Sequence, residues 1–215
     1  MNRHVNDLFV KNSKKEGLRS RSSYKLIEVQ EKRKFIKPHS IVVDLGAAPG
    51  GWSMATTKYI RKEAGGRVVA VDLLKYASVE NCVHVQGDFT HEQTLKEVEA
   101  ALDGRAVDVL LSDMLHNTTG HKQTDHFRSL DLCYTALDFA DSFLGTGGSI
   151  FMKFLRGQDD KELVSAVQKL QFIDGVKILK PAASRKESAE AYLLAMGRAA
   201  PTAPARPAGL SGVPG

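Results

Sequence analysis

The chain contains little of several residue types and patterns, and each shortage excludes a class of protein. Its two cysteines, Cys82 and Cys133, are too few for a disulfide framework and indicate a reducing compartment. No apolar run approaches the roughly 20 residues of a membrane-spanning helix, so we expect no membrane partner. The histidines form no H-x-x-x-H pair and the cysteines no C-x-x-C pair, so we expect no metal site.

The rest of the composition is that of an ordinary globular protein. Hydrophobic residues make up 42% and charged residues 26% of the 215 positions. This length suits one domain with a sizeable core, and we assign that domain to residues 38–198. Four of the seven prolines fall after Ala199 among alanines and glycines. That composition predicts a disordered tail over residues 199–215.

Positive charge is concentrated at the N-terminus. Residues 1–37 carry 11 Lys or Arg against 4 Asp or Glu, whereas residues 38–215 carry 19 against 21. A basic segment beside a near-neutral domain is typical of proteins that bind a polyanion, although a solvated helix face is the alternative. We interpret residues 1–37 as a basic arm and helix that faces RNA. The basic residues of this arm include Lys11, Lys14, Lys15, Arg19, Arg21, Lys25, Lys32, Arg33, Lys34 and Lys37.

Apolar runs alternate with helical patterns along the domain. This alternation predicts an α/β fold with a mostly parallel seven-stranded sheet and helices on both faces. The short connection between the last two runs permits an antiparallel pair there. The expected strands cover 41–45, 67–72, 82–86, 107–112, 148–154, 172–178 and 190–196. The expected helices cover 20–36, 52–63, 92–101, 126–144 and 158–170.

The segment Asp44–Trp52, with sequence DLGAAPGGW, is the most informative part of the chain. An apolar strand breaks here into a glycine-rich turn at a helix start, which is where doubly wound sheets bind adenosine-bearing cofactors. The turn lacks the G-x-G-x-x-G spacing, and this disfavours NAD and with it a dehydrogenase. Asp44 and the bare backbone suit a cofactor that carries an amino acid and a sulfonium. A tight turn without a ligand is the alternative.

Two further aspartates extend the expected cofactor site. Asp72 ends a predicted strand 21 residues after Gly51, where an acidic residue can accept hydrogen bonds from ribose hydroxyls. Asp88 ends the next predicted strand and could accept from an adenine amine. Each aspartate alone is a weak signal, because acids follow strands for many reasons. Together with Asp44 they indicate one site at the carboxyl ends of three strands.

The motifs AAPGGW at 47–52 and GDF at 87–89 resemble those of FtsJ-type RNA ribose 2′-O-methyltransferases. The resemblance extends from about Asn6 to Gly197. It implies a Rossmann-like fold with an antiparallel last strand, and S-adenosylmethionine as the cofactor. The residues that this resemblance and the strand ends assign to the cofactor are Asp44, Gly46, Ala47, Pro49, Gly50, Gly51, Trp52, Asp72, Leu73, Asp88, Phe89 and Asp113.

Two charged residues at strand ends suit the chemistry of methyl transfer to a hydroxyl. An enzyme that transfers a methyl group to a hydroxyl must orient the hydroxyl and remove its proton. A lysine with a lowered pKa is a suitable base for this step. Lys153 ends a predicted strand, an unusual place for an ammonium group, and Asp113 ends the strand that we expect beside the first one. Both therefore emerge at the carboxyl edge of the sheet.

The resemblance completes a catalytic set. FtsJ-type enzymes carry a Lys-Asp-Lys-Glu tetrad, and its members match Lys25, Asp113, Lys153 and Glu190 here. If the last strand is antiparallel, Glu190 at its start reaches the same edge as Asp113 and Lys153. One departure follows Asp113: the family often has Ala-Pro-Asn after the next residue, whereas this chain has Leu115-His116-Asn117.

The resemblance also implies a substrate and a location. It points to a uridine of large-subunit ribosomal RNA, free or in a precursor particle, and to a monomeric enzyme. A tRNA or cap 2′-O-methyltransferase and a non-catalytic RNA-binding ribosome-assembly factor are the alternatives. The segment KPAASRKESAEAY at 180–192 resembles the mitochondrial branch most closely. Residues 1–16 contain Asp7 and Glu16 and do not resemble a presequence. We therefore expect a mitochondrial protein whose targeting segment is absent from this chain, or else a cytoplasmic or bacterial one.

Overall fold

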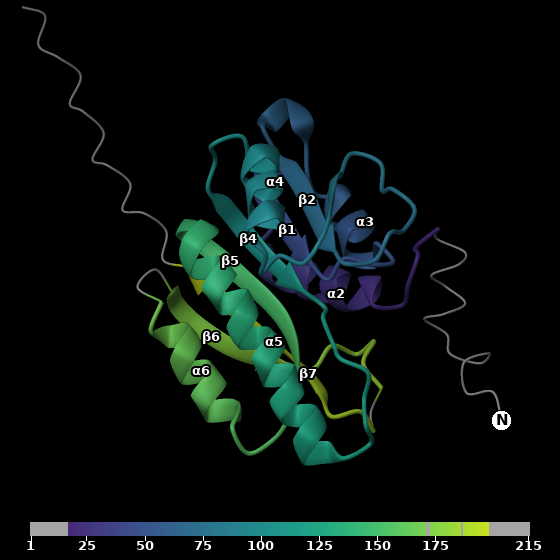
Figure 1. Cartoon of the computed structure of the whole chain (residues 1–215), viewed down its shortest axis with the longest axis vertical. Helices are drawn as coiled ribbons and strands as arrows, with labels where there is room; N and C mark the ends of the chain where they lie inside the picture. The colour runs from purple at the N-terminus through teal and green to yellow at the C-terminus, as the bar shows by residue number, and fades with distance from the viewer. Residues whose placement is uncertain (1–16, 171–172, 186, 198–215) are drawn as a thin grey trace, which may run out of the picture.

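A computed structural model describes residues 17–170, 173–185 and 187–197. They include one seven-stranded sheet, in the order β3-β2-β1-β4-β5-β7-β6 (Figure 1). The predicted tail 199–215 and residues 1–16 of the basic arm lie outside the described residues. The strands are β1 (Ile41–Leu45), β2 (Arg67–Asp72), β3 (Val83–Gln86), β4 (Val107–Ser112), β5 (Leu144–Leu155), β6 (Ile173–Leu179) and β7 (Glu190–Gly197).

The strand directions confirm the predicted sheet. β1 pairs in parallel with β2 and with β4, and the parallel arrangement continues to β3 on one side and β5 on the other. β7 lies between β5 and β6 and is antiparallel to both. Because β7 runs backwards, its first residue, Glu190, pairs with Leu155 at the carboxyl end of β5. Glu190 therefore reaches the edge where the parallel strands end, as predicted.

Helices cover both faces of the sheet (Figure 1). One face packs against α2 (Ser23–Arg33) and α3 (Gly51–Thr57), through a core that includes Leu26 and Trp52. The other packs against α4 (Glu92–Leu102), α5 (Lys122–Phe143) and α6 (Asp160–Gln168), whose buried residues include Val98 and Leu163. All five residues of β1 are buried, because helices cover it on both sides.

Several element boundaries differ from the sequence prediction. The predicted helix 52–63 ends at Thr57, and a short 3₁₀ turn, η1 (Lys62–Ala64), follows separately. α5 begins four residues earlier than predicted, at Lys122, because the His121 side chain accepts a hydrogen bond from the backbone N–H of Thr124. Histidine is not among the usual N-cap residues, so this start carries no common sequence signal. β5 begins at Leu144 rather than at residue 148.

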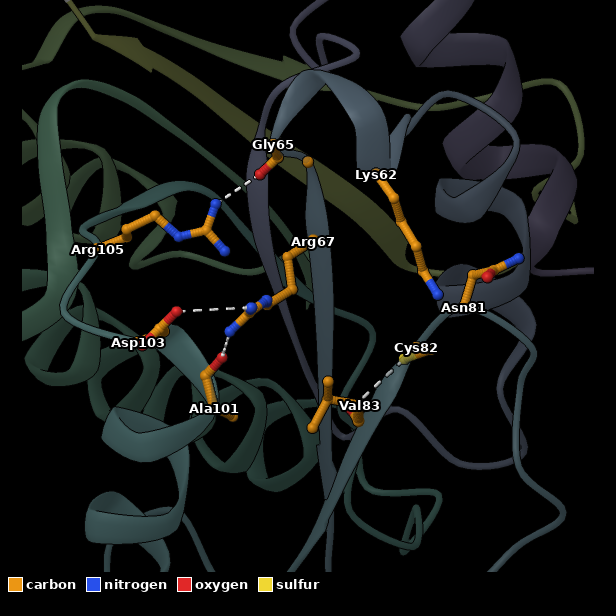
Figure 2. A pocket seen from close by; sticks show the side chains of 10 residues that line it. Lys62, Gly65, Arg67, Asn81, Cys82, Val83, Ala101, Asp103 and Arg105 are labelled. Atoms are coloured by element: carbon orange, nitrogen blue, oxygen red, sulfur yellow. Dashed lines mark hydrogen bonds and ion pairs between the residues drawn. The ribbon is translucent and has the colours of Figure 1, made fainter.

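The sheet has two edges that lie at opposite ends of its parallel strands. The carboxyl ends of β1 to β5 meet at one edge, where the predicted site residues gather. At the opposite edge, the amino ends of β2 and β3 border a hollow of about 860 Å³ (Figure 2). Across the described ranges, no helix combines the length and apolar character needed to cross a membrane.

Candidate active site

The glycine turn between β1 and α3 is held in a fixed shape. Gly46 and Gly50 have φ angles of +69° and +98°, which glycine adopts without the strain that a Cβ would cause. A Cβ on Gly46 would also lie 2.3 Å from Cγ of Met114. The backbone N–H groups of Gly46 and Ala47 donate to the Val71 carbonyl of β2, at 2.9 and 3.1 Å. The turn therefore presents bare backbone beside the end of β2.

Asp72 at the end of β2 is anchored by backbone donors. Its Oδ2 accepts from Ala48 N at 2.8 Å, and its Oδ1 accepts from Leu74 N at 2.7 Å. Each carboxylate oxygen has a further lone pair, so Asp72 can still accept from ribose hydroxyls. The neighbouring Leu73 side chain is 65% exposed and offers an apolar contact at the same edge.

Asp88 lies beyond the end of β3 with one oxygen more open than the other. Oδ1 accepts from the backbone N–H and the hydroxyl of Thr90, at 2.9 and 2.7 Å. These hydrogen bonds lower the pKa of Asp88 below its ordinary value, so it is an ionised acceptor at neutral pH. The next residue, Phe89, packs edge-on against Phe139 of α5 and is partly buried in the core. The Phe89 ring thus packs into the core on the face of the sheet that α5 covers.

The Trp52 side chain occupies a position that the motif alone did not reveal. The Trp52 ring stacks on Phe151, with centroids 5.0 Å apart, and its indole N–H donates to the Ser22 carbonyl. The Trp52 side chain is therefore in the core, and only its backbone borders the turn. Its assignment to the cofactor stays a prediction.

Asp44 is completely buried beneath the glycine turn. Ser53 donates to its Oδ2 at 2.6 Å, while its Oδ1 has no hydrogen-bond partner within the described part of the chain. Burial raises the pKa of Asp44 to about 7, although the Ser53 hydrogen bond opposes this shift. A buried acceptor without a partner costs free energy, so Oδ1 of Asp44 is suited to accept a hydrogen bond from a donor such as an amino group.

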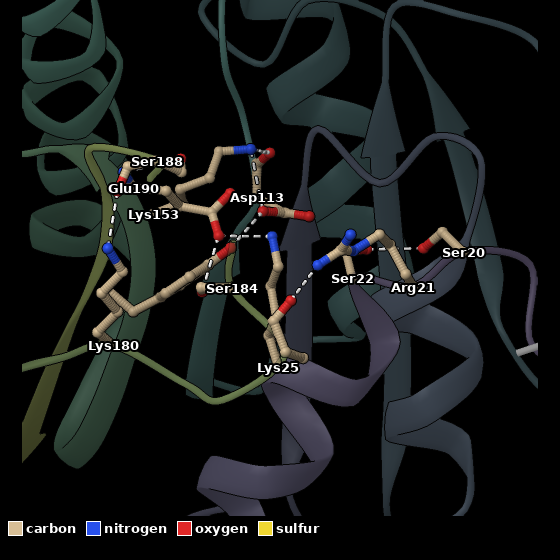
Figure 3. Close-up of polar contacts among 12 residues, drawn as sticks. Ser20, Arg21, Ser22, Lys25, Asp113, Lys153, Lys180, Ser184, Ser188 and Glu190 are labelled. Atoms are coloured by element: carbon tan, nitrogen blue, oxygen red, sulfur yellow. Dashed lines mark hydrogen bonds and ion pairs between the residues drawn. The ribbon is translucent and has the colours of Figure 1, made fainter. Parts of the chain in front are cut away.

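The structure brings the four predicted catalytic residues together (Figure 3). Lys153 Nζ lies 3.0 Å from Oδ1 of Asp113 and also donates to the Asp113 carbonyl. Lys25 Nζ lies 2.7 Å from Oε1 of Glu190. The side chains are 9–18% exposed. The set is therefore two ion pairs of balanced charge, and the Lys25 ammonium is directed at Glu190.

Tyr192 connects the two ion pairs. Its hydroxyl donates to Oδ1 of Asp113 at 3.4 Å, and its ring lies under Lys25 Nζ, 5.4 Å from the centroid. Burial, with the negative charges of Asp113 and Glu190, raises the pKa of Tyr192 well above its ordinary value. Tyr192 thus remains a hydrogen-bond donor at any physiological pH.

Glu190 is ionised although it is largely buried. Burial favours its neutral form, but the charge of Lys25, hydrogen bonds from Lys25 and Ser184, and the charge of Lys153 together outweigh it and lower the pKa. Ser184 Oγ donates to Oε1 of Glu190 at 2.9 Å. Sequence reasoning missed Ser184, because a serine in a loop carries no signal of its own.

The loop between β6 and β7 is tied to α2. The Ala182 N–H donates to Oε2 of Glu28 at 2.6 Å, and the Arg21 guanidinium donates to the Ala183 carbonyl. These contacts hold the loop that carries Ser184 against the helix that carries Lys25. The Lys25–Glu190 pair therefore joins segments more than 150 residues apart.

Arg19 of the basic arm contacts the glycine turn. Its guanidinium donates to the Pro49 carbonyl at 3.2 Å and to the carbonyls of Ala77 and Ser78. A Cβ on Gly50 would lie 2.8 Å from Arg19 Nη1. Arg19 thus ties the loop after β2 to the glycine turn. Its position beside the cofactor turn could not be read from the sequence, because these partners are 30 to 59 residues away.

Among residues 17–170, 173–185 and 187–197, no cluster of three or more His, Cys, Asp or Glu side chains could hold a metal ion. The donor set instead fits S-adenosylmethionine. It combines bare backbone at Gly46–Gly50, partly exposed carboxylates at the ends of β2 and β3, and the buried Oδ1 of Asp44.

Comparison with known proteins decides the family. The model of the FtsJ-like methyltransferases matches residues 18–198. The chain belongs to the FtsJ-like methyltransferase family. A Pseudomonas fluorescens protein named ribosomal RNA large subunit methyltransferase E is 42% identical over 198 residues, which cover 92% of this chain and 92% of that one. An Acinetobacter baylyi protein of the same name is also 42% identical, covering 92% of this chain and 90% of that one.

Solved structures agree on the fold. A Plasmodium falciparum protein described as a ribosomal RNA methyltransferase gives a TM-score of 0.74 at 24% identity, covering 83% of this chain and 97% of that one. A Streptococcus mutans protein in complex with SAH gives a TM-score of 0.50 at 12% identity, covering 83% of this chain and 96% of that one. This FtsJ-like methyltransferase accordingly uses S-adenosylmethionine as its methyl donor.

Proposed function

We propose that this protein transfers a methyl group from S-adenosylmethionine to the ribose 2′-hydroxyl of a uridine in large-subunit ribosomal RNA. The observation that carries the reaction is the contact between Lys153 and Asp113, inside a balanced four-residue cluster beside the glycine turn. The names of the bacterial relatives support ribosomal RNA as the substrate. The uridine and the 2′-oxygen rest on the FtsJ-type motifs.

In this mechanism Lys153 removes the proton of the 2′-hydroxyl. S-adenosylmethionine, when bound, supplies a methyl group that its sulfonium already activates, so the protein needs only to orient and deprotonate the nucleophile. The Asp113 carboxylate and carbonyl fix the direction of Lys153 Nζ. Before transfer, the Lys153 ammonium gives one proton to solvent. The neutral amine then takes the proton of the 2′-oxygen as this oxygen bonds to the methyl carbon, and the bond from that carbon to the sulfonium sulfur would break with S-adenosylhomocysteine leaving.

Lys25, Glu190 and Tyr192 position the acting pair. Tyr192 donates to Oδ1 of Asp113, the same oxygen that Lys153 Nζ contacts, and Lys25 of the Lys25–Glu190 pair lies over the Tyr192 ring. The two cations and two anions leave the cluster neutral, which makes its burial tolerable. Removal of any one charge would leave its partner uncompensated.

The decisive experiment maps ribose methylation across total RNA from cells with and without the gene, and from cells that express Lys153→Ala. We expect one uridine of the large-subunit RNA to lose its methyl group in the deletion strain and in the variant strain. Loss confined to tRNA or to mRNA caps would overturn the choice of substrate. Full methylation with Lys153→Ala would overturn the role of Lys153.

The same proposal places the reaction in mitochondria, because residues 180–192 resemble the mitochondrial branch of the family. Imaging the full-length gene product with a C-terminal tag tests this. Residence in the cytoplasm would contradict it without affecting the proposed reaction.

A further inference from the structure

The hollow at the amino ends of β2 and β3 gathers cations (Figure 2). It is lined by Lys62 from η1, Arg67 from the start of β2 and Arg105 from the α4–β4 connection, with Asn81 and Asp103 at its rim. These residues come from three separate segments of the chain. Three cations against one carboxylate give its lining a net positive charge.

Both arginines of this hollow are held in place by backbone oxygens. Arg67 donates to the Ala101 carbonyl at the end of α4 and lies 3.8 Å from the carboxylate of Asp103. Arg105 Nη1 donates to the Gly65 carbonyl at 2.5 Å. A guanidinium carries five N–H donors, so each arginine retains donors for an anion. Because they are already ordered, binding an anion costs little side-chain entropy.

The other donors at this hollow are uncommitted. Lys62 is exposed, and neither its ammonium nor the Asn81 amide has a hydrogen bond or ion pair within the described ranges. Free, exposed donors beside fixed guanidinium groups suit phosphate oxygens, which accept several hydrogen bonds at once.

The basic surface extends beyond the hollow. A second, smaller hollow of about 210 Å³ adjoins it at Lys62 and Asn81 and adds Arg61 and Glu63 to the lining. Arg61 N donates to the Pro38 carbonyl, so the end of the basic arm, with the exposed Lys37, lies beside this segment. Part of the positive charge of residues 1–37 thus belongs to the amino edge of the sheet and not to the catalytic edge.

We propose that this surface, which we call the amino-edge site (Lys62, Arg67, Asn81 and Arg105), binds the phosphodiester backbone of the RNA substrate at a point remote from the methylated nucleotide. The proposal rests on the proposed function, since it takes RNA as the substrate. β2 separates the two edges by its six residues, a length of about 17–20 Å. A folded RNA of the size of a ribosomal domain reaches both edges at once. Contact at two edges would favour structured RNA over short single strands.

The test uses the full chain and a transcript of a structured large-subunit RNA domain. We measure the affinity of the wild type, Lys62→Glu and Arg105→Gln for this transcript over a range of salt concentrations. Lys62→Glu changes an exposed side chain that has no hydrogen bond or ion pair among the described residues, so its fold should be intact even if Arg105→Gln disturbs the Gly65 turn. The matched control is Lys177→Glu, the same charge change at an exposed position of β6 near the other end of the sheet.

We expect Lys62→Glu to weaken binding about tenfold near 0.1 M salt and to lower the slope of log affinity against log salt by about 1. The KM for the transcript should rise while kcat at saturating RNA stays unchanged, because the amino-edge site lies far from Lys153. The control should behave as the wild type.

Three results would overturn the inference. The first is an affinity and salt slope of Lys62→Glu equal to those of Lys177→Glu. The second is saturable binding of inorganic phosphate or uridine monophosphate that Lys62→Glu abolishes while RNA affinity is unchanged, which would assign the site to a free phosphate compound. The third is a wild-type enzyme that binds and methylates no RNA, and this result alone would also remove the proposed function.

Discussion

Separating the structural from the catalytic contribution of Lys153 tests the reasoning most directly. In Lys153→Met, Asp113 keeps the Tyr192 hydroxyl but loses a cation 3.0 Å away, at a site where the two side chains are 9% and 18% exposed. The Coulomb energy of such a pair is about 5 kcal/mol at an effective dielectric constant near 20, and desolvation offsets part of it. Breaking a buried pair on one side typically costs 3–5 kcal/mol. Because Tyr192 still binds the carboxylate, we expect a loss of about 3 kcal/mol in the free energy of unfolding.

The double variant Lys153→Met/Asp113→Asn removes both charges. It should recover about 2 kcal/mol of the free energy of unfolding, because no uncompensated carboxylate remains. Methyl transfer should remain at least ~10²-fold slower than in the wild type in both variants, since neither has a base. Lys153→Arg should keep the ion pair and the stability, yet be nearly inactive, because a guanidinium does not deprotonate.

Urea unfolding followed by circular dichroism gives the stabilities, and single-turnover transfer of a labelled methyl group to RNA gives the rates. Calorimetric titration with S-adenosylmethionine shows whether each variant still binds its cofactor. A Lys153→Arg enzyme that methylates RNA at the wild-type rate would refute the assignment of Lys153 as base. A double variant no more stable than Lys153→Met would refute the argument from ion-pair compensation.

Three further predictions concern the cofactor side of the site. Asp88→Ala should weaken S-adenosylmethionine binding by about 1–3 kcal/mol in a calorimetric titration, because it removes an ionised acceptor. Arg19→Gln should also weaken cofactor binding, because it releases the 77–78 loop from the glycine turn. The free energy of unfolding of Asp44→Asn, relative to that of the wild type, should increase progressively as the pH rises from about 4 to about 7. The pKa of Asp44 is about 7 in the folded protein, above its ordinary value of 3.8. As the pH rises, Asp44 therefore ionises in the unfolded chain before it ionises in the folded protein. The wild type loses stability through this pH range as a result.

Each of these predictions has an outcome that would contradict it. Arg33→Gln alters an exposed arginine of the same arm, so an equal loss of cofactor affinity in Arg33→Gln and Arg19→Gln would contradict the role of Arg19. Unchanged affinity in Asp88→Ala would remove Asp88 from the cofactor site. For Asp44, a stability difference between wild type and variant that is constant from pH 4 to pH 8 would contradict the raised pKa.

The local elements were largely predictable, because their signals are local. The apolar run at β1 and the glycine turn after it specify a strand, a turn and a helix start within about ten residues. Boundaries were wrong where the deciding partner is unusual or distant. α5 starts at a histidine cap, and β5 extends back to Leu144, which pairs with Val107 of β4.

The sequence by itself determined which residues could do chemistry: a motif between 44 and 52, acids at strand ends, and a lysine at the end of an apolar strand. It did not determine their pairing. Whether Lys25 faces Lys153 or Glu190 depends on the insertion of β7 between β5 and β6, and on the loop contacts that tie Ser184 to α2.

The positions of the basic residues were also only partly determined by the sequence. The composition shows that residues 1–37 are basic, but only the tertiary structure shows that, among the described residues, Arg19 contacts the glycine turn, Lys25 lies beside Glu190 and Lys37 lies near the amino edge. The physical reason is that ion pairs and hydrogen bonds form between groups brought close by packing. A pattern along the chain fixes local conformation and burial, whereas the partner of a charge is chosen by the arrangement of whole strands and helices.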